Sequence, residues 1–229
     1  MHTDLSTVSL AVFDVDGTLV DSQHGIVQAM GEAFVAANLP NPNHADVRRV
    51  VGLKLESAVA QLLPEPDWDL AHRVADLYRD AFVALRGRLD YHEPLYPGAL
   101  EALKALERSG ITLGVATGKN RRGLMITLEK HRLTGLFSTL KTADDGPGKP
   151  DPAMLRAAMN EVGAAAEETV MIGDTVYDMA MARDAAAHAL GVSWGYHETS
   201  ELSAAGALRI LETFDDLAKA LDLADGVKA

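Results

Sequence analysis

The chain has 229 residues, a formal net charge of −12, a hydrophobic content of 48% and no cysteine. This length and composition suit a globular protein with one large domain or two modest ones. The acidic balance excludes the basic footprint that nucleic acid requires. The missing cysteines exclude disulfides and thiolate metal sites, which predicts a cytoplasmic location. No apolar run is long enough to span a membrane, and residues 1–7 lack the basic and apolar segments of a signal peptide.

The first predicted element is a strand at residues 10–13, which ends in the motif Asp14-Val15-Asp16-Gly17-Thr18. Its unbroken apolar run is typical of a strand covered on both faces. Residues two apart in an extended chain point the same way, so Asp14 and Asp16 can face one site. At ~4 Å and an effective dielectric of about 20 they repel by about 4 kcal/mol, which a divalent cation or a shared proton must offset. A strand-end turn with solvated aspartates is the alternative.

Four predicted helices follow with no strand between them. Apolar residues recur at helical spacing from Ile26 to Ala37, and Pro40 and Pro42 end this first pattern. The other helices are expected at residues 45–51, 55–63 and 67–87. Four consecutive helices of this kind indicate a small bundle.

From residue 94 onward the pattern alternates between helices and strands. Strands are expected at residues 111–116, 136–140, 169–172, 188–193 and 208–211. Helices are expected at residues 98–109, at 179–186 and at 215–223. A further helix is expected after Lys119 up to about residue 132, and another begins at an Asp151 N-cap and continues through residue 162. This alternation predicts an α/β fold, with a Rossmann-like parallel sheet and helices on both faces. The chain is therefore expected to divide into an α/β core domain, residues 1–20 and 94–229, and an inserted all-helical cap domain, residues 21–93, with a hinge at each crossing.

Residues that can carry chemistry lie at the predicted carboxyl ends of the strands, where open parallel sheets bind ligands. They fall in four segments, which are residues 14–18, Thr117-Gly118, Lys149-Pro150 and residues 173–178. Together they supply carboxylates, a hydroxyl, an ammonium and flexible glycines. These are the groups that metal-assisted phosphoryl transfer requires.

In this order and combination the four motifs resemble those of the haloacid dehalogenase superfamily, and the helical insertion resembles that of its phosphoglycolate phosphatase-like branch. The resemblance covers the whole core. It implies that Asp14 is a nucleophile that forms an aspartyl phosphate, and that Asp16 protonates the leaving oxygen and then activates water. It also implies a Mg²⁺ ion held by the carboxylates of Asp14 and Asp174 and the backbone carbonyl of Asp16.

The resemblance assigns the other motif residues to the phosphoryl group and its surroundings. Thr117 and the amide of Gly118 would bind phosphoryl oxygens near Gly17, and Lys149 would neutralise charge. Asp178 would act from behind the metal ligands. The structural alternatives are a helix N-cap for Thr117, an ordinary loop lysine at position 149 and a surface helix residue at position 178.

The inserted helices carry three basic residues, Arg48, Arg49 and Lys54, around Gly52. Charges on short helices are usually solvated. In the resembling family the corresponding loop reaches over the site, so Lys54 is the cap residue expected to meet the substrate. The eight histidines form no obvious ligand pair and are expected to be structural or exposed.

The sequence therefore predicts a Mg²⁺-dependent phosphatase of small phosphorylated metabolites, with phosphoglycolate as the leading candidate. Dehalogenases and phosphonate hydrolases with this type of cap lack the second aspartate of the first motif, which is present here as Asp16. A β-phosphoglucomutase-like sugar phosphate mutase, a pyrophosphatase and a catalytically silent phospho-ligand-binding regulator are the alternatives. Neither the physiological ester nor the oligomeric state can be derived from these patterns.

Overall fold

A computed structural model describes residues 5–221. Its centre is a six-stranded parallel sheet in the order β3-β2-β1-β4-β5-β6. The strands are β1 (Leu10–Phe13), β2 (Thr112–Ala116), β3 (Thr139–Lys141), β4 (Thr169–Gly173), β5 (His188–Val192) and β6 (Arg209–Leu211). The chain moves outward from β1 to β3 and then returns to place β4 on the other side of β1. The direction of winding therefore changes between β1 and β4, which is where such sheets bind ligands.

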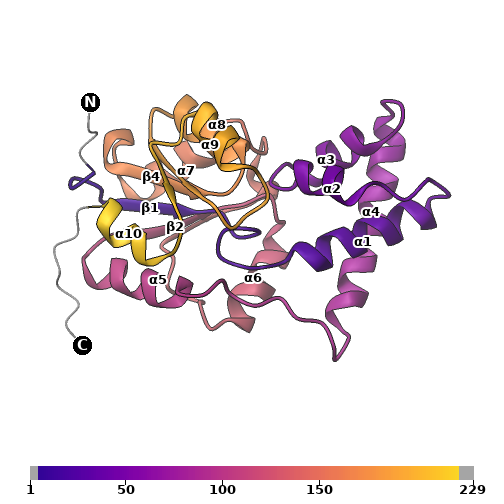
Figure 1. Ribbon diagram of the computed structural model, residues 1–229, viewed down its shortest axis with the longest axis horizontal. Helices are drawn as coiled ribbons and strands as arrows, with labels where there is room; N and C mark the ends of the chain where they lie inside the picture. Colours follow the sequence, from indigo (N-terminus) through magenta and orange to yellow (C-terminus); the bar gives the residue numbers. More distant parts are fainter. Residues whose placement is uncertain (1–4, 222–229) are drawn as a thin grey trace.

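The side chains of β1 alternate between two hydrophobic cores, because successive residues of a strand point to opposite faces. Ala11 and Phe13 pack on one face, and Leu10 and Val12 pack on the other. The first face is covered by α5 (Ala99–Arg108), α6 (Arg121–Lys130) and α10 (Asp215–Ala220). The second is covered by α7 (Ala153–Val162), α8 (Val176–Asp184) and α9 (Thr199–Ala205). Helices thus cover both faces (Figure 1), and the predicted α/β fold class is confirmed.

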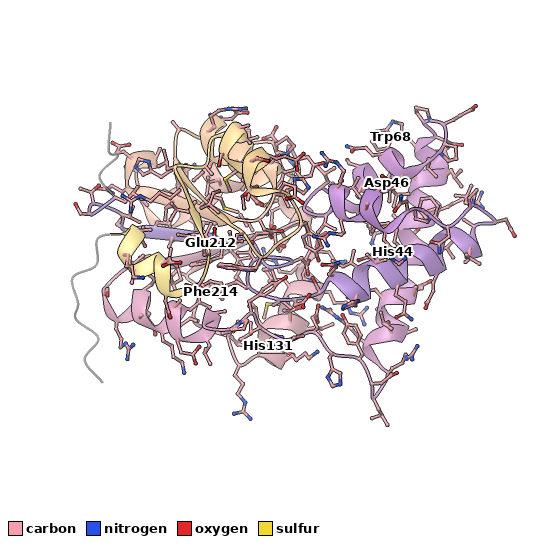
Figure 2. All side chains as sticks on the ribbon, in the orientation of Figure 1. His44, Asp46, Trp68, His131, Glu212 and Phe214 are labelled. Carbon is pink, nitrogen blue, oxygen red and sulfur yellow. The ribbon has the colours of Figure 1, made fainter. Side chains whose placement is uncertain are left out.

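A helical bundle lies beside the carboxyl edge of the sheet (Figure 1). It consists of α1 (Gln23–Ala36), α2 (His44–Val50), α3 (Leu55–Leu62) and α4 (Trp68–Arg86). Its helices surround a hydrophobic cluster that contains Phe34, Val59 and Val74, and Tyr196 from the loop after β5 joins this cluster. His44, Asp46 and Trp68 lie on this bundle, whereas Glu212 and Phe214 lie beside the sheet (Figure 2). The four predicted helices therefore form one packed unit.

Two chain crossings join the bundle to the sheet, and they pair with each other. The amide of Asp21 donates to the carbonyl of Pro94 at 2.9 Å, and the amide of Tyr96 donates to the carbonyl of Leu19 at 2.9 Å. Val20 and Leu95 form an isolated antiparallel bridge between them. Any movement of the bundle must therefore bend both crossings together.

Several predicted boundaries were wrong. The third strand is Thr139–Lys141 instead of residues 136–140, because Phe137 is buried in the core from the connecting loop. Helix α8 begins at Val176, not at residue 179, because Thr175 is its N-cap and forms a capping box with Asp178.

The other differences are smaller. Helix α7 begins at Ala153 with Pro152 as its N-cap, and α9, which follows β5, was not predicted. The predicted end of the last helix, at residue 223, lies outside the described residues. Among the helices described between residues 5 and 221, none combines the length and apolarity that crossing a membrane requires.

The packing of α5 leads to a first prediction. Leu103 is completely buried between α5 and the sheet, so Leu103→Ala should lower the free energy of unfolding by roughly 2–5 kcal/mol, because a cavity replaces its side chain. Urea denaturation measures this change. Leu208→Ala is the control, since Leu208 is 44% exposed and should lose far less. Equal losses would contradict the described core.

Candidate active site

The sheet brings the predicted motif residues to one edge. β1 lies between β2 and β4 and is parallel to both. The residues that follow these strands, Asp14, Thr117 and Asp174, therefore emerge side by side. The amide of Asp14 still belongs to the sheet and donates to the carbonyl of Ile172 at 2.9 Å. The rigid sheet thus sets the position of the Asp14 side chain.

Three carboxylates form what we call the acidic cluster, Asp14, Asp174 and Asp178. One oxygen from each lies within 4.8 Å of the others, and all three residues are buried. Sequence reasoning placed Asp178 behind the metal ligands, whereas the structure brings its carboxylate into the same cluster. The Asp16 carboxylate points to other partners. An oxygen-rich, buried site of this kind has the donor chemistry that Mg²⁺ and Ca²⁺ prefer.

Lys149 brings one positive charge into the acidic cluster. Its Nζ atom lies 2.8 Å from Oδ2 of Asp14 and 2.6 Å from Oδ1 of Asp178, and its side chain is fully buried. The interpretation of Lys149 as an ordinary loop lysine is therefore wrong. A buried ammonium between two carboxylates is retained only where ion pairing repays its desolvation.

Asp174 and Asp178 are held by neighbouring donors. The hydroxyl of Thr18 donates to Oδ1 of Asp174 at 2.7 Å, and the amide of Tyr196 donates to Oδ2 at 2.9 Å. The Oδ2 atom of Asp178 accepts from the hydroxyl of Thr175 at 2.7 Å and from its amide at 3.1 Å. These bonds fix both carboxylates before any ligand binds.

The electrostatics of the acidic cluster favour an additional cation. Burial raises the pKa of Asp14 to about 6, against the lowering effect of Lys149, and the Asp178 charge adds to the rise. Burial also raises the pKa of Asp174 well above its usual range, with Asp14 and Asp178 adding repulsion. Burial and mutual repulsion both disfavour the ionised carboxylates, and an additional cation would offset both effects.

Close backbone approach around Asp174 requires two glycines. A Cβ atom on Gly17, whose φ is +83°, would lie 2.2 Å from Oδ2 of Asp174. A Cβ atom on Gly195 would lie 2.1 Å from the Asp174 Cβ. Because any larger residue would collide, the loops that contain Gly17 and Gly195 can enclose this carboxylate only with glycine at these positions.

A cavity of about 890 Å³ opens between this edge of the sheet and the helical bundle. Asp14, Asp16, Thr117 and Gly118 line it from the sheet side, and Lys54 lines it from the bundle. Asp14 is the member of the acidic cluster that lines the cavity. A molecule in the cavity can therefore reach Asp14, while Asp174 and Lys149 stay behind it.

The bundle touches the motif loops through the segment Gly52–Lys54. A Cβ atom on Gly118 would lie 2.8 Å from the carbonyl oxygens of Gly52 and Leu53, and one on Gly148 would lie 2.9 Å from the Lys54 Cβ. These close distances place the segment directly over the second and third motifs.

Arg48 and Arg49 dock the bundle onto the core at the same side. Arg48 donates to the carbonyl of Gly195 at 3.2 Å. The carbonyl of Arg49 accepts from the hydroxyl of Tyr177 at 2.9 Å, and it lies 3.1 Å from Nε2 of His197. His197 therefore has a structural position, as expected for the histidines.

Comparisons with known proteins decide the family. The sequence profile described as haloacid dehalogenase-like hydrolase matches residues 11–192, which is most of the chain. The chain belongs to this family. A protein of Dickeya dadantii named "Probable phosphatase IndB" is 37% identical over 91% of this chain and 91% of its own length. A phosphoglycolate phosphatase of Agrobacterium fabrum is 33% identical over 82% of this chain and 81% of its own length.

A solved structure agrees with these relatives. The crystal structure of a hydrolase from Pseudomonas syringae is similar to this chain with a TM-score of 0.82 and 31% identity, covering 93% of this chain and 98% of that one. This haloacid dehalogenase-like hydrolase is therefore a phosphatase of the phosphoglycolate phosphatase-like branch.

Sequence reasoning missed the residues that hold Asp16 in this hydrolase. The hydroxyl of Ser22 donates to Oδ1 of Asp16 at 2.5 Å, and Nζ of Lys119 lies 2.8 Å from the same oxygen. Lys119 also lies 3.7 Å from Glu93, a buried carboxylate that forms an ion pair with Arg86. The position of Lys119, two residues after Thr117 at a strand end, was the one available signal.

The N-cap interpretation of Thr117 was wrong. Asn120 caps α6, because its Oδ1 atom accepts from the amide of Gly123 at 2.7 Å. Among the residues that the structure describes, the hydroxyl oxygen of Thr117 accepts one long bond, 3.3 Å, from the amide of Lys119. Thr117 therefore lines the cavity without serving as the helix cap.

The burial of Lys149 leads to a second prediction. Lys149→Met should lower the free energy of unfolding by roughly 3–5 kcal/mol at pH 7 in the presence of a chelator, because it leaves buried carboxylates without their ammonium. Urea denaturation measures the change. Lys219→Met removes a solvent-exposed pair with Asp216 and should have no measurable effect. A Lys149→Met protein as stable as this control would contradict the charge arrangement.

Proposed function

We propose that this phosphatase hydrolyses small phosphate monoesters with Mg²⁺, through an aspartyl phosphate on Asp14. The observation that carries the proposal is the position of Asp14, which belongs to the acidic cluster and also lines the cavity. A nucleophile must be open to substrate on one side and supported by charges on the other. Relatives named phosphoglycolate phosphatase make phosphoglycolate the reference ester against which other substrates are compared, and the enzyme would act in the cytoplasm.

In this proposal Asp14 attacks phosphorus, and the bond to the leaving oxygen breaks. Asp16 donates a proton to that oxygen, and later accepts one from the water that hydrolyses the aspartyl phosphate. Ser22 and Lys119 both contact the Oδ1 atom of Asp16, which supports Oδ2 as the atom that exchanges protons. Asp16 lines the cavity, so it can reach a leaving group there.

The phosphoryl oxygens would be bound by Thr117 and by the amide of Gly118, both in the cavity lining. Gly17 lies against Asp174 instead, so its proposed part is to let the backbone approach that carboxylate. Lys149 would offset charge on Asp14 and on the phosphoryl group from behind. Asp178 would hold Lys149 in place, since its two oxygens are engaged by Lys149 and Thr175.

The donor set fits Mg²⁺. Asp14, Asp174 and Asp178 bring three carboxylates to the one ammonium of Lys149, and burial, with added repulsion from Asp14 and Asp178, raises the pKa of Asp174. Asp14 and Asp174 would hold the ion with the backbone carbonyl of Asp16, while Asp178 would remain paired to Lys149. When bound, the ion supplies positive charge and orients the phosphoryl group.

We also propose that residues 21–93 act as a cap domain on a core of residues 1–20 and 94–229. The hydrophobic cluster of the bundle, to which the core adds Tyr196, and the two paired crossings support this division. Lys54, which lines the cavity from the bundle, would contact the leaving group. Opening at the crossings would exchange substrate and product, and closure would exclude competing water.

A third prediction tests the reaction. The purified enzyme with Mg²⁺ should release phosphate from a panel of esters, and Asp14→Asn should lower turnover by at least about a thousandfold, because the nearly isosteric amide is no nucleophile. Asp69→Asn, on the exposed start of α4, is the matched control. The panel should include pyrophosphate and β-glucose 1-phosphate with a bisphosphate activator. Glucose 6-phosphate as the main product would assign the enzyme to the mutase reaction, and wild-type turnover by Asp14→Asn would refute the covalent mechanism.

A fourth prediction tests the metal without measuring activity. Mg²⁺ at about 100 times its dissociation constant should raise the melting temperature by roughly 5–10 °C relative to chelator, because it binds the folded state selectively. Asp174→Asn should abolish most of this shift, whereas the Asp69→Asn control should keep it. A full shift in Asp174→Asn would place the ion elsewhere.

A further inference from the structure

The cavity remains large although the helical bundle touches the core on both sides of it. On one side, Gly52 and Leu53 lie against Gly118. On the other side, the guanidinium of Arg86 in α4 donates to the hydroxyl of Thr127 in α6 at 2.9 Å, and it lies 3.4 Å from the carbonyl of Gly123. The volume of about 890 Å³ therefore lies between two contacts that join the bundle to the core, and it is partly open to solvent.

Such a volume is close to the upper end of pockets that hold drug-sized ligands, about 300–1,000 Å³. Phosphoglycolate, a phosphate on a two-carbon acid, is much smaller than such ligands. Most of the cavity would stay filled with water if this ester were its only occupant. The space beyond Asp14 thus indicates a larger leaving group.

The walls of this space are largely apolar. They include Ile26 and Met30 from α1, Val50 from α2, Leu53 from the following loop, and Phe82 from α4. An apolar wall gains stability when it covers apolar ligand surface instead of water. These side chains are at most 9% exposed, because they also pack in the hydrophobic clusters of the bundle, so a ligand would cover only the part of each that faces the cavity.

The charges in the lining do not form a strong second anion site. Arg79 is paired with Glu56 and Asp76, Arg86 with Glu93, and Lys119 with Asp16. Within the described part of the chain, Lys54 and Arg122 are the cavity cations for which no ion pair is recorded. Acidic side chains line the cavity too, Asp80 and Asp144 among them. The balance of charge therefore does not demand a second anionic group on the substrate.

Two exposed apolar residues mark the mouth of the cavity. Val83 of α4 is 56% exposed and Ile126 of α6 is 39% exposed, and both line the cavity. Val83 belongs to the bundle and Ile126 belongs to the core, so both parts of the molecule contribute an exposed apolar residue to the cavity. Because both side chains line the cavity, an apolar ligand there would cover them.

From the volume, the apolar walls and these two residues, we propose that the leaving group of the substrate is an alcohol with an apolar, ring-sized body. This proposal rests on the proposed phosphatase reaction at Asp14 and identifies the class of ester. The phosphate lies at Asp14 and Thr117, and the apolar body extends between α4 and α6. The preferred substrate is thus larger and less acidic than phosphoglycolate.

A series of alkyl phosphates tests this class. 2-Phenylethyl phosphate, ethyl phosphate and phosphoglycolate are all esters of primary alcohols, so they differ mainly in what must fit beyond the phosphate. We expect kcat/KM for 2-phenylethyl phosphate to exceed that for each of the other two by about tenfold or more, because its ring is removed from water. Calorimetry with the Asp14→Asn protein should give the same order of affinity.

Variants of Val83 and Ile126 test where the ring of the substrate binds. The double variant Val83→Ser and Ile126→Ser should reduce the preference for 2-phenylethyl over ethyl phosphate by at least about threefold, because both side chains would cover the ring. Leu208→Ser is the control, since Leu208 is 44% exposed, between the values for Ile126 and Val83, and does not line the cavity. It should leave the preference unchanged.

The outcomes separate this proposal from the proposed function. If phosphoglycolate is the best substrate, the proposal of an apolar leaving group is wrong, but the phosphatase reaction stands. The same holds if the Asp14→Asn protein binds the phenylethyl and ethyl esters with equal affinity. Selective binding of the phenylethyl ester without phosphate release would support the apolar site and refute the reaction. An unchanged preference in the double variant would place the ring elsewhere and overturn the assigned site.

Discussion

Three buried carboxylates and one buried ammonium share the carboxyl edge of the sheet, and the surrounding structure depends on this arrangement. Asp14, Asp174 and Asp178 lie close enough to repel one another, and Lys149 pairs with two of them. Like charges at ~4 Å repel by about 4 kcal/mol even at an effective dielectric of about 20. A fold can hold such a group only with rigid strands, satisfied oxygen atoms and a further source of positive charge.

Particular residues of the structure meet each of these requirements. The strands are rigid because β1 is buried between two cores, with Ala11 and Phe13 on one side and Leu10 and Val12 on the other. Thr18 and Thr175 satisfy carboxylate oxygens, and Gly17 allows the backbone to come close enough to do so. The missing positive charge is what the proposed Mg²⁺ ion would supply.

The helical bundle connects to the same site through Asp16. Ser22, just after the first crossing, and Lys119 share one oxygen of Asp16, and Lys119 also faces Glu93 at the second crossing. A shift of the bundle would therefore disturb the partners of the residue proposed to exchange protons. The bundle also contributes most of the apolar cavity wall, including Ile26, Met30 and Phe82.

The sequence by itself determined the α/β fold class, the helical insertion and the four motifs, because hydrophobic periodicity and short-range spacing are local properties. It also predicted that Asp14, Thr117, Lys149 and Asp174 would meet, since parallel strands end at one edge. It did not reveal that Phe137 is buried from a loop or that α8 begins at Val176, where tertiary packing and side-chain capping decide the boundary. The link of Lys119 to Asp16 and Glu93, the docking of Arg48, and the size and apolarity of the cavity were decided only by the tertiary structure. These features join residues far apart in the chain, and their distances depend on how the bundle packs on the sheet, which no local pattern encodes.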